Sequence, residues 1–517
     1  MVDQLGEAIH EIAPEFDHEV VGAGGRPLAP DEQTGEMYPD AVPDRPGWHV
    51  RLFGSHEFFR LWVVQVISAT GDWLGFSAII LLAAGIGGTT SAGAGAGAIS
   101  LVMAARIVPG FFFGPLAGVL VDRWDRKRVM IICDLGRAAV VVCLPWVHSL
   151  GGLVLASLVL EVLTLLWSPA KEASVPNLVP ADHLTTANSL SLAAAYGTFP
   201  FASLLFALLA GVSAWLGSIG ALHFLSLNQM ALAFYVDGAT FVLAALLVRT
   251  LPLTRRRSVA ATPSAAAERH PEASVRRRVG QTLDELKAGW HYIFINHTVR
   301  AVNLGLATGL VGGGMLIPLG AVFSTEVLGA GPAGYGLFTT ALGFGVAIGA
   351  VGVSVLQKRL PKARVFTGGL LLAGAFLFAA ASSSSLGSAT LFVGLMGVTI
   401  GPVYVMGFVM LQQEVDDDLR GRVFSSLNTL VRLCVLVSMV AGPLLSAVLG
   451  GLSERMLGGS IDVAGFTIAV PGVRLTLWLA ALIIMGAGVL ALSSLRSGQR
   501  SQAAIAAQHP SRRPGPG

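Results

Sequence analysis

Four ionisable side chains stand inside long apolar stretches of the sequence: Asp72, Arg106, Glu161 and Asp237. An ion in the hydrocarbon of a bilayer costs about 3 kcal/mol or more unless it is paired or reaches water. A carboxylate in a cavity that opens to alternate sides of a membrane can carry a proton between them. These residues therefore predict a central, proton-exchanging cavity in which Asp72 and Arg106 lie at one depth and can pair. The alternative is a set of structural ion pairs.

A second group of charges lies closer to the ends of the apolar stretches. Asp134 and Arg137 are three residues apart, so on a helix they share one face and can pair. Arg432 lies at a similar depth in a later stretch, and Glu172 lies near the end of another. We interpret these four residues as structural ion pairs or as a charge relay to the central cavity.

Three uncharged polar residues, Gln65, Ser68 and Asn303, also fall inside apolar stretches. They are candidates for lining a substrate cavity, although such groups also form hydrogen bonds between helices. The aromatic residues Trp73 and Phe111–Phe113 favour packing or lipid contact over a ligand cage. The polar candidates therefore carry less weight than the charged ones.

Motifs for other chemistry are missing from the sequence. It has no Walker loop for ATP, no hydrolase triad and no carboxylate pair with metal-ligand spacing. The 11 His residues show no metal spacing, and the 3 Cys residues stand singly in apolar runs. A net charge of +3 is too small to indicate a nucleic-acid partner. The sequence therefore predicts neither an enzyme nor a metal or cofactor site.

The composition indicates which elements carry these residues. The chain of 517 residues is 53% hydrophobic and 13% charged, whereas soluble proteins are about 25% charged. Such a chain belongs in a lipid bilayer, which a helix of about 20 apolar residues can cross. The sequence predicts twelve such helices, at 57–86, 94–121, 129–148, 152–173, 186–211, 229–249, 301–327, 333–357, 364–382, 388–411, 424–449 and 474–495.

The distribution of Lys and Arg predicts the orientation of these helices. Of the 34 Lys and Arg residues, only Arg455 and Arg474 fall at the predicted external connections. Cationic loops remain in the cytoplasm during membrane insertion. We therefore predict a multi-pass protein of the cell membrane with both termini cytoplasmic.

The chain divides into two hydrophobic halves with polar segments around them. Residues 56–250 and 300–497 each hold six predicted helices, and similar segments after the fourth and tenth helices indicate a duplication. Residues 1–55 and 498–517 are expected to form disordered cytoplasmic tails. Residues 251–299 are expected to form a cytoplasmic linker that contains a short amphipathic helix.

One segment has a specific spacing: Gly118-x-x-x-Asp122-Arg123-x-x-Arg126-Lys127, at the end of the second predicted helix. It resembles the signature loop of the major facilitator superfamily. The resemblance implies an all-α integral membrane protein in which twelve transmembrane helices form two six-helix bundles. It also implies that Asp122 and Arg123 brace a cytoplasmic gate, while Gly118 lets another helix approach closely.

Further segments resemble the macrolide-efflux and enterobactin-exporter branch of this superfamily. They are Arg106-x-x-Pro109, Asp134-Leu-Gly-Arg137, SPAKEASVPNLVP, ANSL and LRGRVFSSL, and the resemblance covers roughly residues 57–495. It implies a secondary active transporter that exports amphipathic small molecules, such as drugs, macrolide-like antibiotics or siderophores. The implied mechanism is alternating access driven by proton antiport.

The chain also departs from the family pattern. Val353 stands where the second half would repeat the acid of the gate motif. The antiporter motif of the fifth helix is reduced to Gly197-Thr-Phe-Pro200. Within the gate motif, Arg126 is expected to reach an acid at the end of the fourth helix, for which Glu172 is available. The change to Val353 indicates a weaker second gate, and the reduced motif of the fifth helix weakens the argument for proton antiport.

Two other functions remain open on the same fold. One is a facilitator that moves lysophospholipids or other lipids, and the other is a non-transporting membrane scaffold or sensor. Buried charges favour a transporter, because a scaffold has no need of them. We expect a small-molecule substrate, a proton as coupling ion, the lipid bilayer as surroundings and a monomeric protein.

Overall fold

The computed structural model describes residues 48–88, 94–219, 230–252, 295–356, 359–415, 417–458, 460–463 and 466–508. The chain divides into two units, Met1–Leu52 and Phe53–Gly517, and every helix long enough to cross a membrane lies in the second. The amphipathic helix expected in the linker, and most of the expected amino-terminal tail, lie outside the described residues.

Twelve helical segments of the described residues are long and apolar enough to cross a membrane, which confirms the predicted number. The short helix α2 (Trp48–Phe53) precedes them. The first half comprises α3 (His56–Gly88), α4 (Ala94–Arg123), α5 (Arg126–Cys143), α6 (Leu150–Glu172), α7 (Leu184–Gly197) with α8 (Phe199–Gly217), and α9 (Ala231–Arg249), with short turns η1 (Leu144–Trp146), η2 (Val175–Asn177) and η3 (Ala181–His183).

The second half follows residues 253–294. It comprises α11 (His297–Val322) with the π-helical turn η5 (Phe323–Val327), α12 (Gly331–Leu356), α13 (Lys362–Ser382), α14 (Leu386–Glu414), α15 (Asp417–Leu457) and α16 (Gly472–Gln508). Between α15 and α16, the strands β1 (Ser460–Val463) and β2 (Phe466–Ala469) form an antiparallel hairpin in which Ser460 pairs with Ala469. Helix α16 continues to Gln508, through the first part of the expected carboxyl-terminal tail.

Side chains of the preceding loops fix where several helices begin. Asp125 accepts a hydrogen bond from the amide of Arg128 at the start of α5, at 2.9 Å. Asn296 accepts bonds from the amides of Thr298 and Val299 at the start of α11. These oxygens satisfy amide groups that have no partner within the first helical turn.

The fifth predicted helix is divided in two. Helix α7 ends at Gly197 and α8 begins at Phe199, with Thr198 between them. Pro200 has no amide hydrogen, so the regular hydrogen-bond ladder cannot continue through it. The hydroxyl of Thr198 donates to the carbonyl of Ala194 at 3.0 Å. The segment Gly197-Thr-Phe-Pro200 therefore interrupts a membrane-spanning segment at the junction of α7 and α8.

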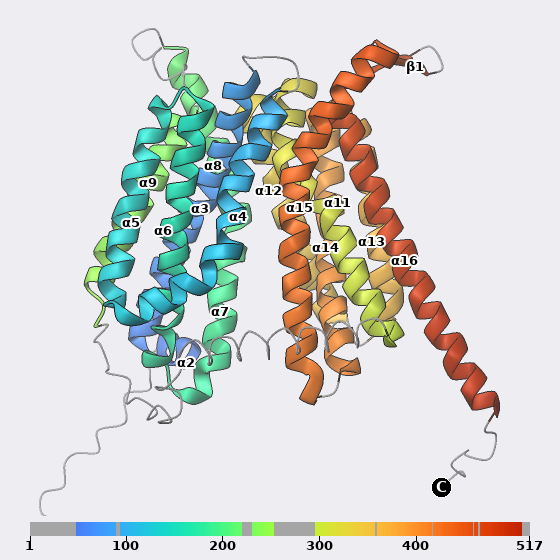
Figure 1. Ribbon diagram of the computed structural model, residues 1–517, viewed down its shortest axis with the longest axis horizontal. Helices are drawn as coiled ribbons and strands as arrows, with labels where there is room; N and C mark the ends of the chain where they lie inside the picture. The colour runs from blue at the N-terminus through green and yellow to red at the C-terminus, as the bar shows by residue number, and fades with distance from the viewer. Residues whose placement is uncertain are drawn as a thin grey trace, which may run out of the picture. The chain divides into compact units, whose positions relative to one another are not determined.

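The helices form two groups, which confirms the predicted fold. Figure 1 shows α3–α9, coloured blue to green, beside α11–α16, coloured yellow to red. The groups touch mainly where α8 meets α12 and where α4 meets α15. A Cβ on Gly336 of α12 would lie 2.7 Å from the Cα of Ala207 in α8, so glycine permits this approach. Ser100 of α4 donates to the carbonyl of Val440 in α15 at 2.7 Å.

Candidate functional site

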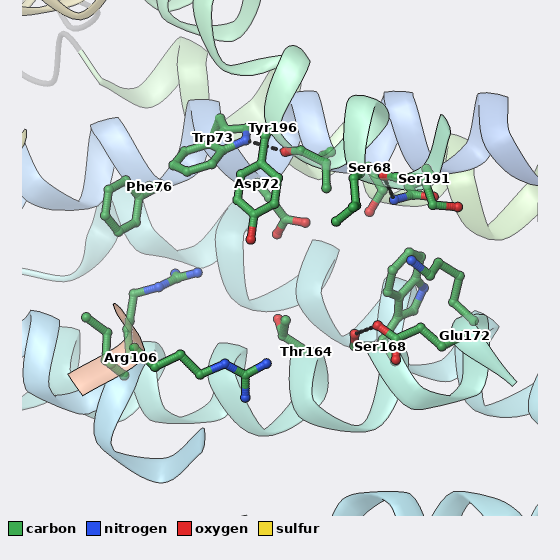
Figure 2. A pocket seen from close by; sticks show the side chains of 18 of the residues that line it. Ser68, Asp72, Trp73, Phe76, Arg106, Thr164, Ser168, Glu172, Ser191 and Tyr196 are labelled. Atoms are coloured by element: carbon green, nitrogen blue, oxygen red, sulfur yellow. Dashed lines mark hydrogen bonds between the residues drawn. The ribbon is translucent and has the colours of Figure 1, made fainter. Parts of the chain in front are cut away.

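A cavity of about 850 Å³ lies between α3, α4, α6 and α7 of the first bundle and α15 of the second. Helix α3 contributes one stripe of residues at a spacing of three to four, the repeat of a single helix face. Figure 2 shows this stripe and the polar side chains opposite it. The residues of α3 in the wall include Gln65, Ser68, Asp72, Trp73 and Phe76.

Helices α6 and α7 form the next part of the wall, with the same spacing of three to four residues. Lys171 and Glu172 mark the end of this wall on α6, where the chain leaves the helix. The cavity therefore extends from the middle of the first bundle to the connection between α6 and α7. The polar and aromatic residues of these two helices in the wall are Thr164, Trp167, Ser168, Lys171, Glu172, Asn188, Ser191 and Tyr196.

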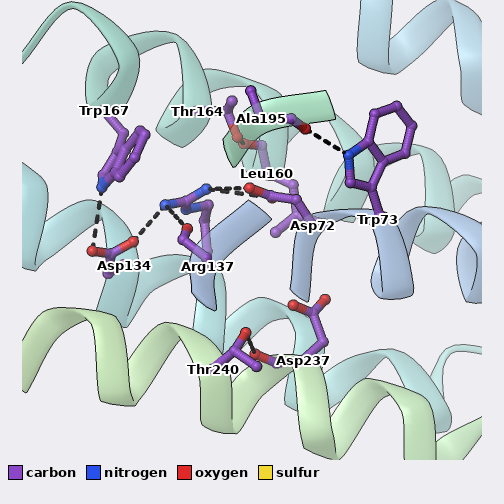
Figure 3. Close-up of polar contacts among 11 residues, drawn as sticks. Asp72, Trp73, Asp134, Arg137, Leu160, Thr164, Trp167, Ala195, Asp237 and Thr240 are labelled. Atoms are coloured by element: carbon purple, nitrogen blue, oxygen red, sulfur yellow. Dashed lines mark hydrogen bonds and ion pairs between the residues drawn. The ribbon is translucent and has the colours of Figure 1, made fainter. Parts of the chain in front are cut away.

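Arg137 of α5 lies behind this wall and links two carboxylates (Figure 3). Its Nη1 is 3.3 Å from Oδ2 of Asp72, and its Nη2 donates to Oδ1 of Asp134. The Arg137 and Asp134 side chains are 1% and 0% exposed, whereas the Asp72 side chain is 37% exposed. Trp167 donates to the second oxygen of Asp134 at 3.2 Å. The cluster thus joins a buried ion pair to a carboxylate of the cavity wall.

This cluster differs from one expected ion pair and contains another. Asp72 forms its ion pair with Arg137 and not with Arg106, because α5 brings its guanidinium to the same level of α3. The pair expected between Asp134 and Arg137 is present. The guanidinium of Arg137 also lies over the ring of Phe241 in α9, 4.3 Å from its centroid, in a cation–π arrangement.

Asp237 of α9 is buried beside the same cluster. Its Oδ1 has no hydrogen-bond partner among the described residues. Helix α3 makes room for it with two glycines: a Cβ on Gly75 would overlap Oδ2 of Asp237, and one on Gly71 would lie 2.5 Å from Oδ1. A space of about 10 Å³, close to the size of one water, is lined by Asp237, Asp72 and Arg137.

Arg106 of α4 and Arg432 of α15 face the large cavity from different bundles. Arg106 lies over the ring of Phe76, 5.9 Å from its centroid. Glu161 of α6 lines neither of the two large cavities, which corrects the expectation for this residue. Its Oε1 instead faces Gly110 of α4, 3.5 Å from where a Cβ would stand. Arg432, which was expected to be a structural or relay charge, also lines the wall of the polar cavity.

Of the three uncharged candidates, two line the polar cavity and one does not. Gln65 and Ser68 line the cavity, and both are also bonded: Gln65 donates to the carbonyl of Ser191 at 2.7 Å, and Ser68 accepts from Arg137. Asn303 does not line either large cavity. It is fully buried in α11 and donates to the carbonyl of Val299 one turn earlier, at 2.8 Å.

The gate motif is described in part. The backbone of Asp122 and Arg123 closes α4, but their side chains lie outside the described part of the structure. No described atom lies within 4 Å of the position that a Cβ on Gly118 would take. The described residues therefore show no close helix approach at Gly118.

The other two cations of the motif bind the ends of helices. Arg126 donates to the carbonyl of Ala173 at 2.5 Å, and not to the carboxylate of Glu172 as expected. Lys127 donates to the carbonyl of Leu251, just after α9, at 2.7 Å. The last carbonyls of a helix lack intrahelical partners and carry partial negative charge, so they attract cations. The motif therefore ties the α4–α5 turn to the ends of α6 and α9.

A second cavity, of about 600 Å³, has a mainly apolar wall drawn from both bundles. It shares Trp73 and Tyr196 with the polar cavity. Trp73 donates to the carbonyl of Ala195 at 2.8 Å and packs edge-on against Phe199, which fixes its ring beside the break between α7 and α8. The apolar cavity was not predicted from the sequence.

Lys171 and Tyr196 are wall residues that sequence reasoning missed. Lys171 lies in the last turn of α6 with only 8% of its surface exposed. A signal was present: Thr164, Ser168 and Lys171 follow one another at a helical spacing of four and three residues.

Comparison with known proteins decides the family. The Major Facilitator Superfamily profile matches residues 61–439, well over half of the sequence. The chain belongs to the major facilitator superfamily. It is 27% identical over 398 residues to YfiS, an MFS-type transporter of Bacillus subtilis, covering 75% of this chain and 86% of that protein.

Two further comparisons agree with this membership. Macrolide efflux protein A of Streptococcus pyogenes is 22% identical over 414 residues, which cover 79% of this chain and 93% of that protein. A bacterial homolog of the human lysosomal transporter Spinster, solved inward-facing and unoccupied, has a TM-score of 0.64 at 16% identity. That match covers 86% of this chain and 98% of the other, and shows the shared fold. The protein is thus a multi-pass membrane transporter of this superfamily.

Proposed function

We propose that this major facilitator protein exports amphipathic small molecules by alternating access, coupled to proton antiport. Drugs, macrolide-like antibiotics and siderophores are the substrate classes to test. The large cavity supports the proposal, since it combines charged and aromatic walls within a membrane-spanning bundle. Distant similarity to macrolide efflux protein A supports the export direction.

The orientation is part of this proposal. An even number of spanning segments puts the start of α3 and the end of α16 on one side of the membrane. The α4–α5 turn, on that same side, holds Arg126, Lys127 and Arg128, so the positive-inside rule makes this side cytoplasmic. The polar cavity extends to the end of α6, also on this side. The described state then corresponds to one that faces the cytoplasm.

The ion pair between Arg137 and Asp72 is the observation that carries proton coupling. Arg137 contacts two carboxylates, Asp72 and Asp134, so the cluster has one negative charge in excess. An uncompensated charge within the membrane raises the free energy of the protein, and binding of one proton neutralises it. Asp72 is the carboxylate of the two that reaches the cavity, so the proton enters there. Protonation of Asp72 weakens its hold on Arg137 and thereby the contact between α3 and α5.

Alternating access requires the opposite side to open. There, α4 meets α15 and α8 meets α12, through close approaches such as that of Gly336 to Ala207. Among the described residues, the bond from Ser100 to the carbonyl of Val440 joins the two bundles and must break for them to separate. We infer that the two bundles separate along these helix pairs when the cytoplasmic side closes.

Accumulation assays test the proposal. Cells that express the protein and control cells are loaded with a panel of amphipathic drugs, macrolides and siderophores, with and without a protonophore. The expected result is lower accumulation of at least one compound, abolished by the protonophore. Reduced accumulation that survives collapse of the proton gradient would contradict antiport, and no effect across the panel would contradict drug export.

The apolar cavity favours a second candidate function, the movement of lysophospholipids or other lipids. Its wall, which includes Phe199, Phe201 and Phe344, suits an acyl chain. Reconstitution with labelled lysophospholipid distinguishes the two: protein-dependent movement of the lipid without a proton gradient supports the facilitator. Absence of transport in both assays supports the scaffold or sensor.

A further inference from the structure

The polar cavity contains three cations that approach it from different helices: Arg106 of α4, Lys171 of α6 and Arg432 of α15. None of the three has a carboxylate oxygen within 4.0 Å among the described residues. Arg432 lies on the same face of α15 as Val435 and Met439, which also line the cavity. Within the described part of the chain, the cavity therefore presents guanidinium and ammonium groups that form no ion pair.

The carboxylates nearby make their closest contacts elsewhere and form no ion pair with these cations among the described residues. Asp72 is directed to Arg137, at 3.3 Å. Glu172, at the end of α6, accepts from the hydroxyl of Ser168 in the preceding turn, at 3.3 Å. Glu161 faces Gly110 on α4, outside ion-pair distance of Arg106. Of the charged residues that line the cavity, three are cationic and two, Asp72 and Glu172, are anionic. Because the two carboxylates make other contacts, an anionic group could form charge-assisted hydrogen bonds with the cations.

The apolar cavity adjoins this cationic site. Trp73 and Tyr196 line both cavities, so a molecule can place one end against the cations and the other beyond these two rings. Apolar area removed from water there contributes roughly 25 cal/mol per Å². Together the cavities match a molecule with one anionic end and one apolar end.

We propose that the transported substrate is an amphipathic anion, whose charged group binds between Arg106 and Arg432 and whose apolar part passes Tyr196 into the second cavity. This inference rests on the proposed export function and narrows its substrate class. Guanidinium groups bind carboxylate, sulfonate and phosphate alike, through planar paired hydrogen bonds. A free organic anion and an anionic lysolipid share this chemistry, and the experiment separates them.

The test uses full-length protein in nanodiscs of neutral phosphatidylcholine, with empty nanodiscs as background. Three probes are titrated: decanesulfonate, decyltrimethylammonium, which has the same chain with a cationic end, and methanesulfonate, which has no chain. The expected order of affinity places decanesulfonate first by at least tenfold. Equal or tighter binding of the cation overturns the proposal, and so does methanesulfonate binding as tightly as decanesulfonate.

Variants locate the site. Arg432→Gln and Arg106→Gln should each weaken decanesulfonate binding at least tenfold, whereas Arg455→Gln, an exposed arginine at the far end of α15, should not. Arg432→Glu should bind decyltrimethylammonium better than the wild type does, which shows that the variant still folds. If Arg432→Gln and Arg455→Gln weaken decanesulfonate binding equally, the proposed anion site is wrong.

Two further measurements separate this proposal from the one on which it rests. Lysophosphatidic acid that binds with the same dependence on Arg432, and more tightly than decanesulfonate, assigns the anion to a lipid; weaker binding assigns it to a free amphiphile. Proton-driven export of cationic drugs without decanesulfonate binding would overturn the proposal of an anionic substrate and leave the export function standing. Decanesulfonate binding without any proton-driven transport leaves the anion site intact and overturns the export function.

Discussion

Nη1 of Arg137 lies 3.3 Å from Oδ2 of Asp72, which links a buried cation of α5 to a carboxylate of the cavity wall on α3. Asp134 holds the other nitrogen of the same guanidinium. With Asp72 ionised, the two carboxylates outnumber the single guanidinium by one charge, and protonation of Asp72 leaves Arg137 and Asp134 as a neutral buried pair. The protonation of Asp72 can therefore bias the arrangement of α3 against α5.

Asp72→Asn should abolish proton-driven transport while the protein still folds. The amide cannot ionise, so Arg137 and Asp134 form a neutral pair whose energy no longer depends on a proton. Transport driven by a pH gradient in proteoliposomes should fall at least tenfold, or about 1.4 kcal/mol, whereas substrate exchange without a gradient should continue. Asp182→Asn, an exposed carboxylate beside α7, is the control. Normal gradient-driven transport in Asp72→Asn would remove this residue from coupling.

Glu161→Gln should have a much smaller effect than Asp72→Asn. The sequence favoured both residues equally, but Glu161 lines neither large cavity and has no contact with Arg137 among the described residues. We expect the gradient-driven rate to change by less than about threefold, or about 0.7 kcal/mol, in the same proteoliposomes. Loss comparable to that of Asp72→Asn would show that Glu161 carries the proton in another state of the cycle.

The sequence predicted the helices and their grouping far better than the site. A bilayer requires about 20 apolar residues in each membrane-spanning helix, and Lys and Arg favour the cytoplasmic loops. Each span can therefore be predicted from its own stretch of sequence. The pairing of Asp72 depends on which helix packs against α3, and spacing along the chain does not encode that. Arg106 lies at a suitable depth on α4, but α5 places Arg137 closer. The apolar cavity likewise arises from residues of both bundles, beside the break at Thr198.

Gly75→Ala should destabilise the protein, because the added methyl group would overlap the carboxylate of Asp237. Overpacking of this kind costs about 1–3 kcal/mol. The thermal midpoint of the detergent-solubilised protein should fall for Gly75→Ala but not for Gly85→Ala, where nothing lies within 4 Å of the new group. Adding Asp237→Ala to Gly75→Ala should restore part of the loss. If the double variant shows no recovery, the contact between α3 and α9 is not the cause.

Asp122→Asn should slow the transport cycle without loss of substrate binding. Asp122 stands near the end of α4, on the side that the proposed orientation makes cytoplasmic, and the resemblance to the gate signature gives it a role in closing that side. We expect the transport rate to fall by roughly 5- to 30-fold, equivalent to about 1–2 kcal/mol, with unchanged decanesulfonate affinity in nanodiscs. Loss of binding in Asp122→Asn would contradict a role confined to the gate.

Export of a monovalent amphipathic anion in exchange for one proton should be electrogenic. The anion leaves while the proton enters, so each cycle moves two positive charges toward the cytoplasm. A membrane potential of 100 mV then contributes about 5 kcal/mol per cycle, at about 2.3 kcal/mol per charge. Decanesulfonate is permanently ionised, so it does not cross the bilayer as a neutral acid.

Inside-out vesicles measure this directly, because export appears there as uptake. A potassium gradient with valinomycin sets a lumen-positive potential, which should accelerate decanesulfonate uptake at constant pH on both sides. Arg432→Gln vesicles serve as the control, since Arg432 belongs to the proposed anion site and the variant should lose uptake at every potential. A rate independent of potential in the wild type would contradict net charge movement, and therefore the combination of an anionic substrate with proton antiport.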